Sequence, residues 1–372
     1  MIDRMSEHSG KLPIIYISPY YMPNDSSGGN RRFNEICKRF NEEYGENFTL
    51  IVTQGQRPPW WNESSNLVEI EYHFDHWSKM HAMRQIAAFL DAQPPSIVIL
   101  ESVPIPYASL KRHAHFQVAY DFRYFTGDSK SLLYRMLFSR YLRSQWQRAE
   151  FFVTPTEFSI SELQKYVGFD RLKIVQSYFG IDPNLLDALD LPPLPKKYDV
   201  IYVGHFERRK NHIPLLYAIA EVNKNLRVKL IGYDTGMRSQ LEALAKELGL
   251  LAVTFESVNN DELLWQYYRE SKVFVYPSIY EGFGIPTIEA LVLGLPIICS
   301  DIPVFHEVGG DLVNYFDPRD PHDIAEKLLA ALHNPYIPPK EKVRAHLQKF
   351  LWNNIYEKFD ADVQRLASTK LR

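Results

Sequence analysis

The sequence predicts an α/β protein made of two doubly wound domains. Short apolar runs rich in β-branched residues alternate with helix-length amphipathic segments along the chain, which is typical of parallel strands covered by helices on both faces. This pattern stops at a proline-rich stretch, 191–197, and then begins again. A chain of 372 residues is long for one hydrophobic core and suits two domains of ordinary size.

In the first half of the chain, apolar runs bounded by turn-forming residues predict seven strands. They are Ile14–Ser18, Phe48–Thr53, Val68–Tyr72, Ile97–Leu100, Phe116–Tyr120, Phe151–Thr154 and Ile174–Gln176. Helices are predicted between them, near residues 30–44, 78–92, 129–148 and 156–167. These elements define a first domain, 1–182.

The second half repeats the same alternation after a stiff, proline-rich linker, 183–197. Its predicted strands are Tyr198–Val203, Val228–Gly232, Val253–Phe255, Val273–Tyr276, Ile297–Ser300 and Val313–Phe316. The predicted helices lie near 211–223, 236–249, 259–270, 286–294 and 320–332, and a long helical region follows Pro338-Pro339. These elements define a second domain, 198–350. Doubly wound domains bind their ligands outside the carboxyl ends of the strands, so a ligand is expected in a cleft between the two.

The composition is that of an ordinary globular protein, with 45% hydrophobic and 23% charged residues. A net charge of −3 and the lack of a basic arm argue against nucleic acid as a partner. Cys37 and Cys299 fall in different predicted domains, so we expect no disulfide and a reducing compartment. The first apolar stretch, Leu12–Tyr21, is short and contains two prolines, which fits neither a signal peptide nor a membrane span. A cytoplasmic location is expected.

Two glutamates, Glu281 and Glu289, stand eight positions apart around a glycine-rich turn. The turn follows the strand that ends at Tyr276, and Pro286 is suited to the first residue of the next helix, where a missing N–H costs nothing. The free N–H groups and the positive end of that helix favour a phosphate in front of the turn. Gly282 and Gly284 would let such a ligand approach the backbone. Taken singly, these residues also fit a solvated loop.

A second loop, Gly204-His-Phe-Glu-Arg-Arg-Lys-Asn, connects the first strand of this domain to its first helix. Gly204 frees the turn, while Arg209 offers a planar fork and Lys210 a compact charge to a diphosphate. The alternative is a cluster of solvated loop charges.

The first domain carries weaker signals at two strand ends. After its first strand come Gly28 and Gly29, followed by Arg31 and Arg32, in a stretch that also fits a permissive turn and a solvated first helical turn. The strand that ends at Tyr120 is followed by Asp121, which could hold a substrate or cap the next turn.

The second half resembles the retaining glycosyltransferases of family 4, whose signature is a Glu-x7-Glu element. The resemblance rests on the Glu281 turn, on Gly294-Leu-Pro-Ile-Ile-Cys-Ser, on Asp301-Ile-Pro-Val-Phe-His-Glu-Val-Gly-Gly and on Tyr315-Phe-Asp-Pro. It covers about residues 198–335 with specific motifs and the first half more thinly. It implies the GT-B fold, in which two Rossmann-like domains face each other across a cleft. It also implies that the final helix, about 351–372, crosses back to complete the first domain.

The resemblance also implies roles for individual residues. Glu281 would contact the hydroxyls of the donor sugar and Glu289 those of the ribose, while Arg209 and Lys210 would hold the diphosphate. The residues expected to bind the donor are Gly28, Gly29, Gly204, Phe283, Gly284, Ile285, Pro286, Thr287 and Glu289. Asp121 and Tyr120 are expected on the acceptor side. The chain departs from the family at Tyr120, where many relatives have histidine, and at His205, where many have arginine or threonine.

No Asp-x-Asp motif at a strand end and no His/Cys cluster suggests a bound metal, so no metal and no cofactor are expected. The expected mechanism is then electrostatic. The sugar–phosphate bond loosens, Arg209, Lys210 and the helix at Pro286 stabilise the leaving diphosphate, and the acceptor hydroxyl attacks from the same face.

Segment 130–148 combines five cations with apolar and aromatic residues at helical spacing. Such a helix can lie on an anionic membrane surface, where lipid-linked acceptors are found, or it can bury its apolar face in the domain core.

The sequence thus predicts a cytoplasmic, retaining hexosyltransferase. Its donor is a nucleotide diphosphate sugar, with UDP-glucose the first choice and GDP-mannose the second, and its acceptor is a glycan or lipid-linked. One alternative is a sugar-nucleotide epimerase of the same architecture, and another is a non-catalytic sugar-nucleotide-binding subunit of a polysaccharide assembly complex.

Overall fold

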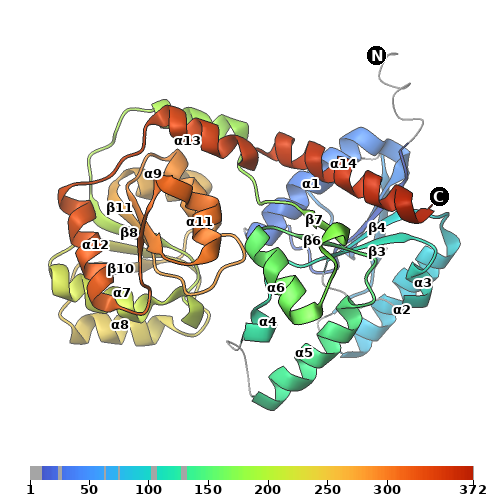
Figure 1. Cartoon of the computed structure of the whole chain (residues 1–372), viewed down its shortest axis with the longest axis horizontal. Coiled ribbons are helices and arrows are strands. Elements are labelled where there is room, and N and C mark those ends of the chain that lie inside the picture. Colours follow the sequence, from blue (N-terminus) through green and yellow to red (C-terminus); the bar gives the residue numbers. More distant parts are fainter. Residues whose placement is uncertain are drawn as a thin grey trace. The chain divides into compact units, whose positions relative to one another are not determined.

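The computed structural model describes residues 11–23, 27–62, 64–73, 76–101, 107–126 and 132–371 (Figure 1). The chain divides into two compact units, each of which is described by itself. Unit 1 consists of Met1–Phe179 with Trp352–Arg372, and unit 2 is Gly180–Leu351. The stretch 183–197, predicted as a linker, therefore belongs to unit 2. Its first part forms a 3-10 helix, Pro183–Asp190, in which Leu185, Leu186 and Leu189 are buried.

The sheet of unit 1 has seven parallel strands in the order β3-β2-β1-β4-β5-β6-β7. They are β1 (Ile14–Ile17), β2 (Phe48–Thr53), β3 (Asn66–Ile70), β4 (Ile97–Glu101), β5 (Ala114–Val118), β6 (Phe151–Thr154) and β7 (Ile174–Gln176). Strand order reverses between β1 and β4, which is the point where doubly wound sheets bind ligands.

Helices cover both faces of this sheet. They are α1 (Gly28–Tyr44), α2 (His76–Ala92), α3 (Tyr107–Leu110), α4 (Arg123–Thr126), α5 (Leu132–Trp146), α6 (Glu157–Val167) and α14 (Trp352–Leu371). Because side chains alternate along a strand, Ile14 and Tyr16 join one core cluster with residues of α1 and α14, and Ile15 and Ile17 join another with residues of α2. The final helix is thus part of the core of unit 1.

Unit 2 has a sheet of six parallel strands in the order β10-β9-β8-β11-β12-β13. The strands are β8 (Tyr198–Val203), β9 (Val228–Ile231), β10 (Val253–Glu256), β11 (Ser271–Tyr276), β12 (Ile297–Ser300) and β13 (Asn314–Phe316). The helices are α7 (His212–Val222), α8 (Arg238–Glu247), α9 (Asp261–Arg269), α10 (Ile285–Val292), α11 (Pro303–Gly309), α12 (Pro321–His333) and α13 (Lys340–Leu347). Figure 1 shows α7, α8 and α12 on one side of this sheet and α9 and α11 on the other. Strand order reverses between β8 and β11.

The predicted fold class is confirmed, since both sheets are parallel, doubly wound and covered on two faces. The prediction missed the short helices α3, α4 and α11, which have too few residues to show a helical period. It also treated the region after Pro338-Pro339 as one helical segment, whereas α13 and α14 are separated by a 3-10 turn, Gln348–Phe350. Cys37 and Cys299 are both free and buried, as expected.

Helix α5 covers most of the cationic segment 130–148; residues 130 and 131 lie outside the described part of the chain. Leu142 and Trp146 pack into the core cluster formed with α6 and β6, whereas Leu137 and Tyr141 are exposed. The C-terminal half of α5 therefore contributes to the core, which agrees with the interpretation that this helix buries its apolar face in the domain.

Candidate functional site

The candidate site of unit 2 is built on the two strands where the order of the sheet reverses. Strands β8 and β11 are hydrogen-bonded neighbours, and the loops that follow them carry Arg209, Lys210 and Glu281. Because the strands are parallel, both loops emerge at the same edge of the sheet. The loops are also joined directly, since the Ile279 N–H donates to the Arg209 carbonyl at 2.9 Å.

Glu281 lies between the two predicted cations. Lys210 Nζ donates to Glu281 Oε1 at 2.6 Å, and Arg209 Nη1 donates to Glu281 Oε2 at 2.8 Å. Lys210 also donates to the Tyr276 hydroxyl at 2.8 Å, and Arg209 pairs with Glu207 at 2.5 Å. The sequence predicted the three central residues but not their mutual pairing. Tyr276 and Glu207 were missed, although both stood within the quoted motifs.

The cluster is buried, with only 7% of the Lys210 and Glu281 side chains exposed. Burial alone would raise the pKa of Glu281, but Lys210 and Arg209 outweigh it and lower this pKa to about 2. Burial lowers the pKa of Lys210, although Glu281 opposes the shift. Burial also acts against the charge of Arg209, but Glu281 and Glu207 raise the pKa of its guanidinium. The positive charges of Arg209 and Lys210 are thus balanced by the carboxylates of Glu281 and Glu207 in a largely buried cluster.

This pairing predicts a specific loss of stability in acid. Glu281 has an ordinary pKa of 4.5 and a folded pKa of about 2, so its contribution is complete above pH 4.5 and is lost as the pH falls toward 2. Between pH 7 and pH 3, wild type should lose roughly 2 kcal/mol more unfolding free energy than Glu281→Gln. Urea unfolding at a series of pH values measures the difference. The matched control is Glu242→Gln, which removes the carboxylate of an exposed ion pair on α8. Its unfolding free energy should depend on pH as that of wild type does. If the unfolding free energies of wild type and Glu281→Gln fell in parallel with pH, the lowered pKa of Glu281 would be refuted.

Two features shape the strand-to-helix turn before α7. Gly204 has φ +154°, and a Cβ there would lie 2.5 Å from the Tyr202 hydroxyl, so a side chain is excluded. Asn211 is the only described non-glycine residue with positive φ, and its side-chain amide donates to the Pro318 carbonyl at 2.6 Å. The amide fixes the end of the Arg208–Lys210 turn and so positions the two cations.

The glycine-rich turn opens α10 as predicted, with a one-residue difference. The helix begins at Ile285, so Pro286 is its second residue, and Gly284 is the N-cap with φ +94°. A Cβ at Gly284 would lie 2.7 Å from the Phe305 ring, which requires glycine here on both counts. Phe283 is buried and packs edge-on against Phe350, so its side chain contributes to the core of unit 2.

Several buried polar atoms around the turn have no protein hydrogen-bond partner among the described residues. They include Thr287 Oγ1, in the first turn of α10, and Arg209 Nε. Buried polar atoms are usually paired, so such atoms mark groups that a ligand or ordered water would satisfy. Both fall on residues that the sequence assigned to donor binding or catalysis.

Glu289 lies on α10 and is 5% exposed. Its Oε2 accepts a hydrogen bond from the Tyr268 hydroxyl of α9 at 3.3 Å. The prediction placed Glu289 on this helix, but it did not foresee the tyrosine. A buried carboxylate at this position is an acceptor suited to hydroxyl groups.

Unit 1 has its own polar cluster at the point where its strand order reverses. Glu101 ends β4, and both of its carboxylate oxygens accept hydrogen bonds, from Tyr16 at 2.8 Å, from Ser18 at 2.7 Å and from Tyr120. Glu101 was not singled out in the sequence, because a glutamate that ends an apolar strand resembles any solvated strand end. Tyr120 was predicted, and the structure shows that its hydroxyl is held by this carboxylate.

Arg32 belongs to the same region and is completely buried. It donates to Ser177 at 2.9 Å, and its guanidinium lies 5.8 Å from the Tyr120 ring centroid and 5.0 Å from that of Phe359 in α14. Of the interpretations given for this stretch, a solvated Arg32 is wrong, because this side of α1 faces the core. Arg32 therefore links α1 to the strand ends and to the final helix.

The remaining predicted residues of unit 1 lie beside this cluster. Gly28 and Gly29 are the first residues of α1, after the N-cap Ser27; residues 24–26 lie outside the described part of the chain. A Cβ at Gly29 would lie 3.3 Å from the Tyr120 ring, so glycine allows this close approach. The Asp121 carboxylate accepts the Arg123 N–H at 3.3 Å, which is the capping role considered in the sequence.

Within the described residues, no group of three or more His, Cys, Asp or Glu side chains is arranged to hold a metal ion. The site of unit 2 instead combines two cations, a buried carboxylate between them and a helix N-terminus. This arrangement can bind an anionic ligand that also presents hydroxyl groups.

Two parallel-sheet, Rossmann-like domains in one chain form the architecture of the GT-B glycosyltransferases. Among solved structures, a glycosyltransferase from Rickettsia africae ESF-5 matches with a TM-score of 0.72 over 96% of this chain and 99% of that chain, at 17% identity. The sucrose-phosphate synthase from Thermosynechococcus elongatus matches with a TM-score of 0.74 over 96% and 100%, also at 17% identity. At these identities the likeness concerns the fold.

The sequence comparisons give one family match and several relatives. The family model "Glycosyl transferases group 1" matches residues 190–349. The O-antigen chain mannosyltransferase B of Escherichia coli is 28% identical over 230 residues, which are 57% of this chain and 60% of that protein. The serotype-specific mannosyltransferase WbdA, also of Escherichia coli, is 37% identical over 131 residues, 34% of this chain and 16% of that protein. This chain thus spans less than two thirds of either relative.

Proposed function

We propose that this protein is a retaining glycosyltransferase that moves a hexose from a nucleotide diphosphate sugar to a glycan or a lipid-linked acceptor. The observation that carries the proposal is the buried contact of Glu281 with Arg209 and Lys210 at the reversal point of a doubly wound sheet. The family match over the same unit supports it.

The proposed mechanism starts from the paired state. Without a donor, Glu281 and Glu207 satisfy the cations, so the buried charges are never left unpaired. A bound diphosphate would take over Arg209 and Lys210, and Glu281 would turn its oxygens to the sugar hydroxyls. As the sugar–phosphate bond breaks, negative charge grows on the diphosphate, where the two cations and the N-terminus of α10 stabilise it. The acceptor hydroxyl attacks from the same face, and the leaving phosphate oxygen takes its proton.

Mannose is the proposed sugar. Two relatives that match this chain are named as O-antigen or serotype-specific mannosyltransferases, so GDP-mannose moves ahead of UDP-glucose as the proposed donor. A lipid-linked O-antigen or related polysaccharide precursor is the proposed acceptor class. In the described residues, no helix is both long and apolar enough to cross a membrane.

A donor panel tests the proposal. Purified protein should be incubated with GDP-mannose, UDP-glucose or ADP-glucose, with and without EDTA, and the release of nucleoside diphosphate measured. We expect slow hydrolysis of GDP-mannose that EDTA leaves unchanged, because side chains and a helix terminus meet the donor charge. Loss of activity in EDTA that Mg²⁺ or Mn²⁺ restores would contradict the metal-independent mechanism.

The same panel separates the alternatives. An isomerised sugar nucleotide in the absence of acceptor would indicate an epimerase instead. Binding of a donor without any hydrolysis or transfer would indicate a non-catalytic subunit.

A further inference from the structure

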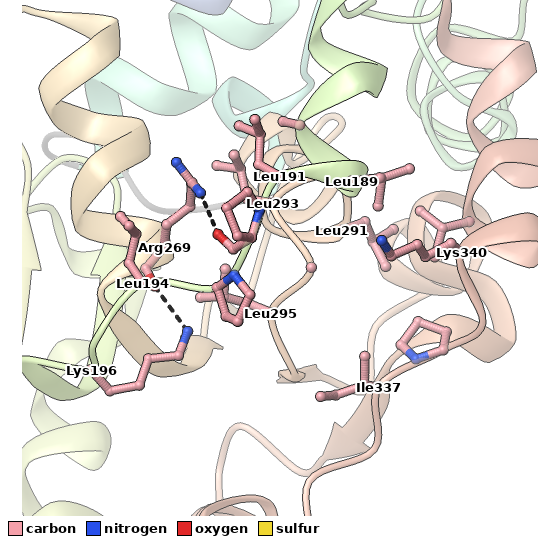
Figure 2. A pocket seen from close by; sticks show the side chains of 16 residues that line it. Leu189, Leu191, Leu194, Lys196, Arg269, Leu291, Leu293, Leu295, Ile337 and Lys340 are labelled. Atoms are coloured by element: carbon pink, nitrogen blue, oxygen red, sulfur yellow. Dashed lines mark hydrogen bonds between the residues drawn. The ribbon is translucent and has the colours of Figure 1, made fainter.

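Unit 2 contains a cavity of about 220 Å³ at the C-terminal end of α10. Figure 2 shows the leucine side chains that line it, between Arg269 on one side and Lys340 on the other. None of the residues proposed to bind the donor lines this cavity, and Leu291 lines it near the last residue of α10. The cavity is therefore separate from the proposed donor site and has no role in the mechanism.

The lining of this cavity is mainly aliphatic. Leu189, Leu291 and Leu295 are buried around it, whereas Leu191 and Ile337 are 51% and 59% exposed. Exposed aliphatic side chains beside a buried aliphatic lining form an apolar surface. Covering this surface with a hydrocarbon chain lowers the free energy, because apolar area is removed from water. The volume lies below the roughly 300 Å³ at which pockets for drug-sized molecules begin, so a single narrow chain fits better than a ring system.

The charged residues that line the cavity are all cations. They are Lys196, Arg269 and Lys340, and no carboxylate belongs to the lining. The Asp190 carboxylate lies 3.4 Å from Lys340 Nζ and balances part of its charge. Among the described residues, Lys196 and Arg269 have no carboxylate within ion-pair distance; Lys196 donates to the Arg269 carbonyl at 2.9 Å, and Arg269 donates to the Pro192 carbonyl at 2.7 Å (Figure 2). Partial desolvation by the surrounding residues, and then the nearby Arg269, lower the pKa of Lys196.

We infer that this cavity binds the aliphatic chain of a phosphate-bearing amphiphile, with the phosphate at Lys196 and Arg269. A phosphate monoester carries about −1.5 to −2 charges at pH 7, which matches two uncompensated cations better than the single charge of a carboxylate. The remaining N–H donors of the guanidinium and the ammonium can bond its oxygens. The inference does not depend on glycosyl transfer, because neither the donor nor the acceptor enters the argument.

Isothermal titration with decyl phosphate, below the concentration at which it forms micelles, tests the inference. We expect one binding site per chain, and affinity that rises about fourfold for each methylene added from hexyl to decyl phosphate until the cavity is filled. Inorganic phosphate and decyltrimethylammonium should not bind, and excess GDP should not displace decyl phosphate. Displacement by GDP would place the amphiphile at the donor site and overturn the inference. Decanoate that bound as tightly as decyl phosphate would overturn the assignment of a phosphate head group.

Variants of exposed residues locate the site without disturbing the core. Ile337→Asp should weaken decyl phosphate at least tenfold, since it places a carboxylate in the aliphatic lining. Lys196→Gln should weaken decyl phosphate about fivefold and decanol less than twofold. Leu251→Asp is the matched control, because Leu251 is an exposed leucine of the same unit that does not line the cavity. Equal weakening by Leu251→Asp and Ile337→Asp would show adsorption to the surface at large and refute the site.

Discussion

Lys210→Ala is expected to lower turnover about a hundredfold while the fold stays intact. The lost ammonium is proposed to stabilise charge that grows on the leaving diphosphate, and a contact of this kind is worth roughly 3 kcal/mol in the transition state. The fold should survive, because Arg209 remains as a partner for the buried Glu281 carboxylate. Arg209→Ala should act in the same direction. Steady-state kinetics with the donor identified by the panel measure both effects.

The matched control for Lys210→Ala is Lys246→Ala, an exposed lysine in the last turn of α8. It should turn over like wild type. Wild-type turnover in both Lys210→Ala and Arg209→Ala would remove the loop after β8 from the mechanism, whatever the structural importance of its ion pairs.

Glu281→Gln and Glu289→Gln are expected to fail in different ways. Glu281 is proposed to hold the sugar ring as positive charge develops, so its replacement should lower kcat. Affinity for the bare nucleoside diphosphate should not fall, since Glu281 pairs with the two cations that are proposed to bind the diphosphate. Glu289, proposed to bind the ribose, touches a part of the donor that does not react. Its replacement should weaken nucleotide and donor alike by roughly 1.5–3 kcal/mol and raise KM.

Calorimetric titration of the bare nucleoside diphosphate into the two variants separates these outcomes. Glu242→Gln, on the exposed face of α8, controls for the removal of a charge from unit 2. Loss of nucleotide affinity in Glu281→Gln, with none in Glu289→Gln, would show that the two roles are reversed.

The strands were the most predictable part of this protein. Five of them, β2, β6, β7, β8 and β12, have the predicted bounds, because short β-branched runs between turn residues give a local signal. The short helices α3 and α4 were missed, since one turn of helix is set by its neighbours and not by periodicity.

The candidate site was predictable in its residue types but not in its pairing. The motifs named Arg209, Lys210 and Glu281, but about seventy positions separate the loops, and only the parallel pairing of β8 and β11 brings them together. Glu101 was not predictable at all, because its partners, Tyr16, Ser18 and Tyr120, come from different strand ends. The position of Arg32 depends likewise on Phe359, more than three hundred residues away.

The place of α14 in the core of unit 1 sets the order in which the chain can mature on the ribosome. Unit 2 is one continuous segment, Gly180–Leu351, and has all of its residues as soon as it has been synthesised. Unit 1 begins first but still lacks Phe359 and Val363, which are fully buried in the finished protein. At roughly 5–20 residues per second, synthesis of the 172 residues of unit 2 holds unit 1 unfinished for about 10–35 s. The apolar face of α1 lacks its α14 partners during that interval, so the half that is synthesised first exposes aggregation-prone surface longest.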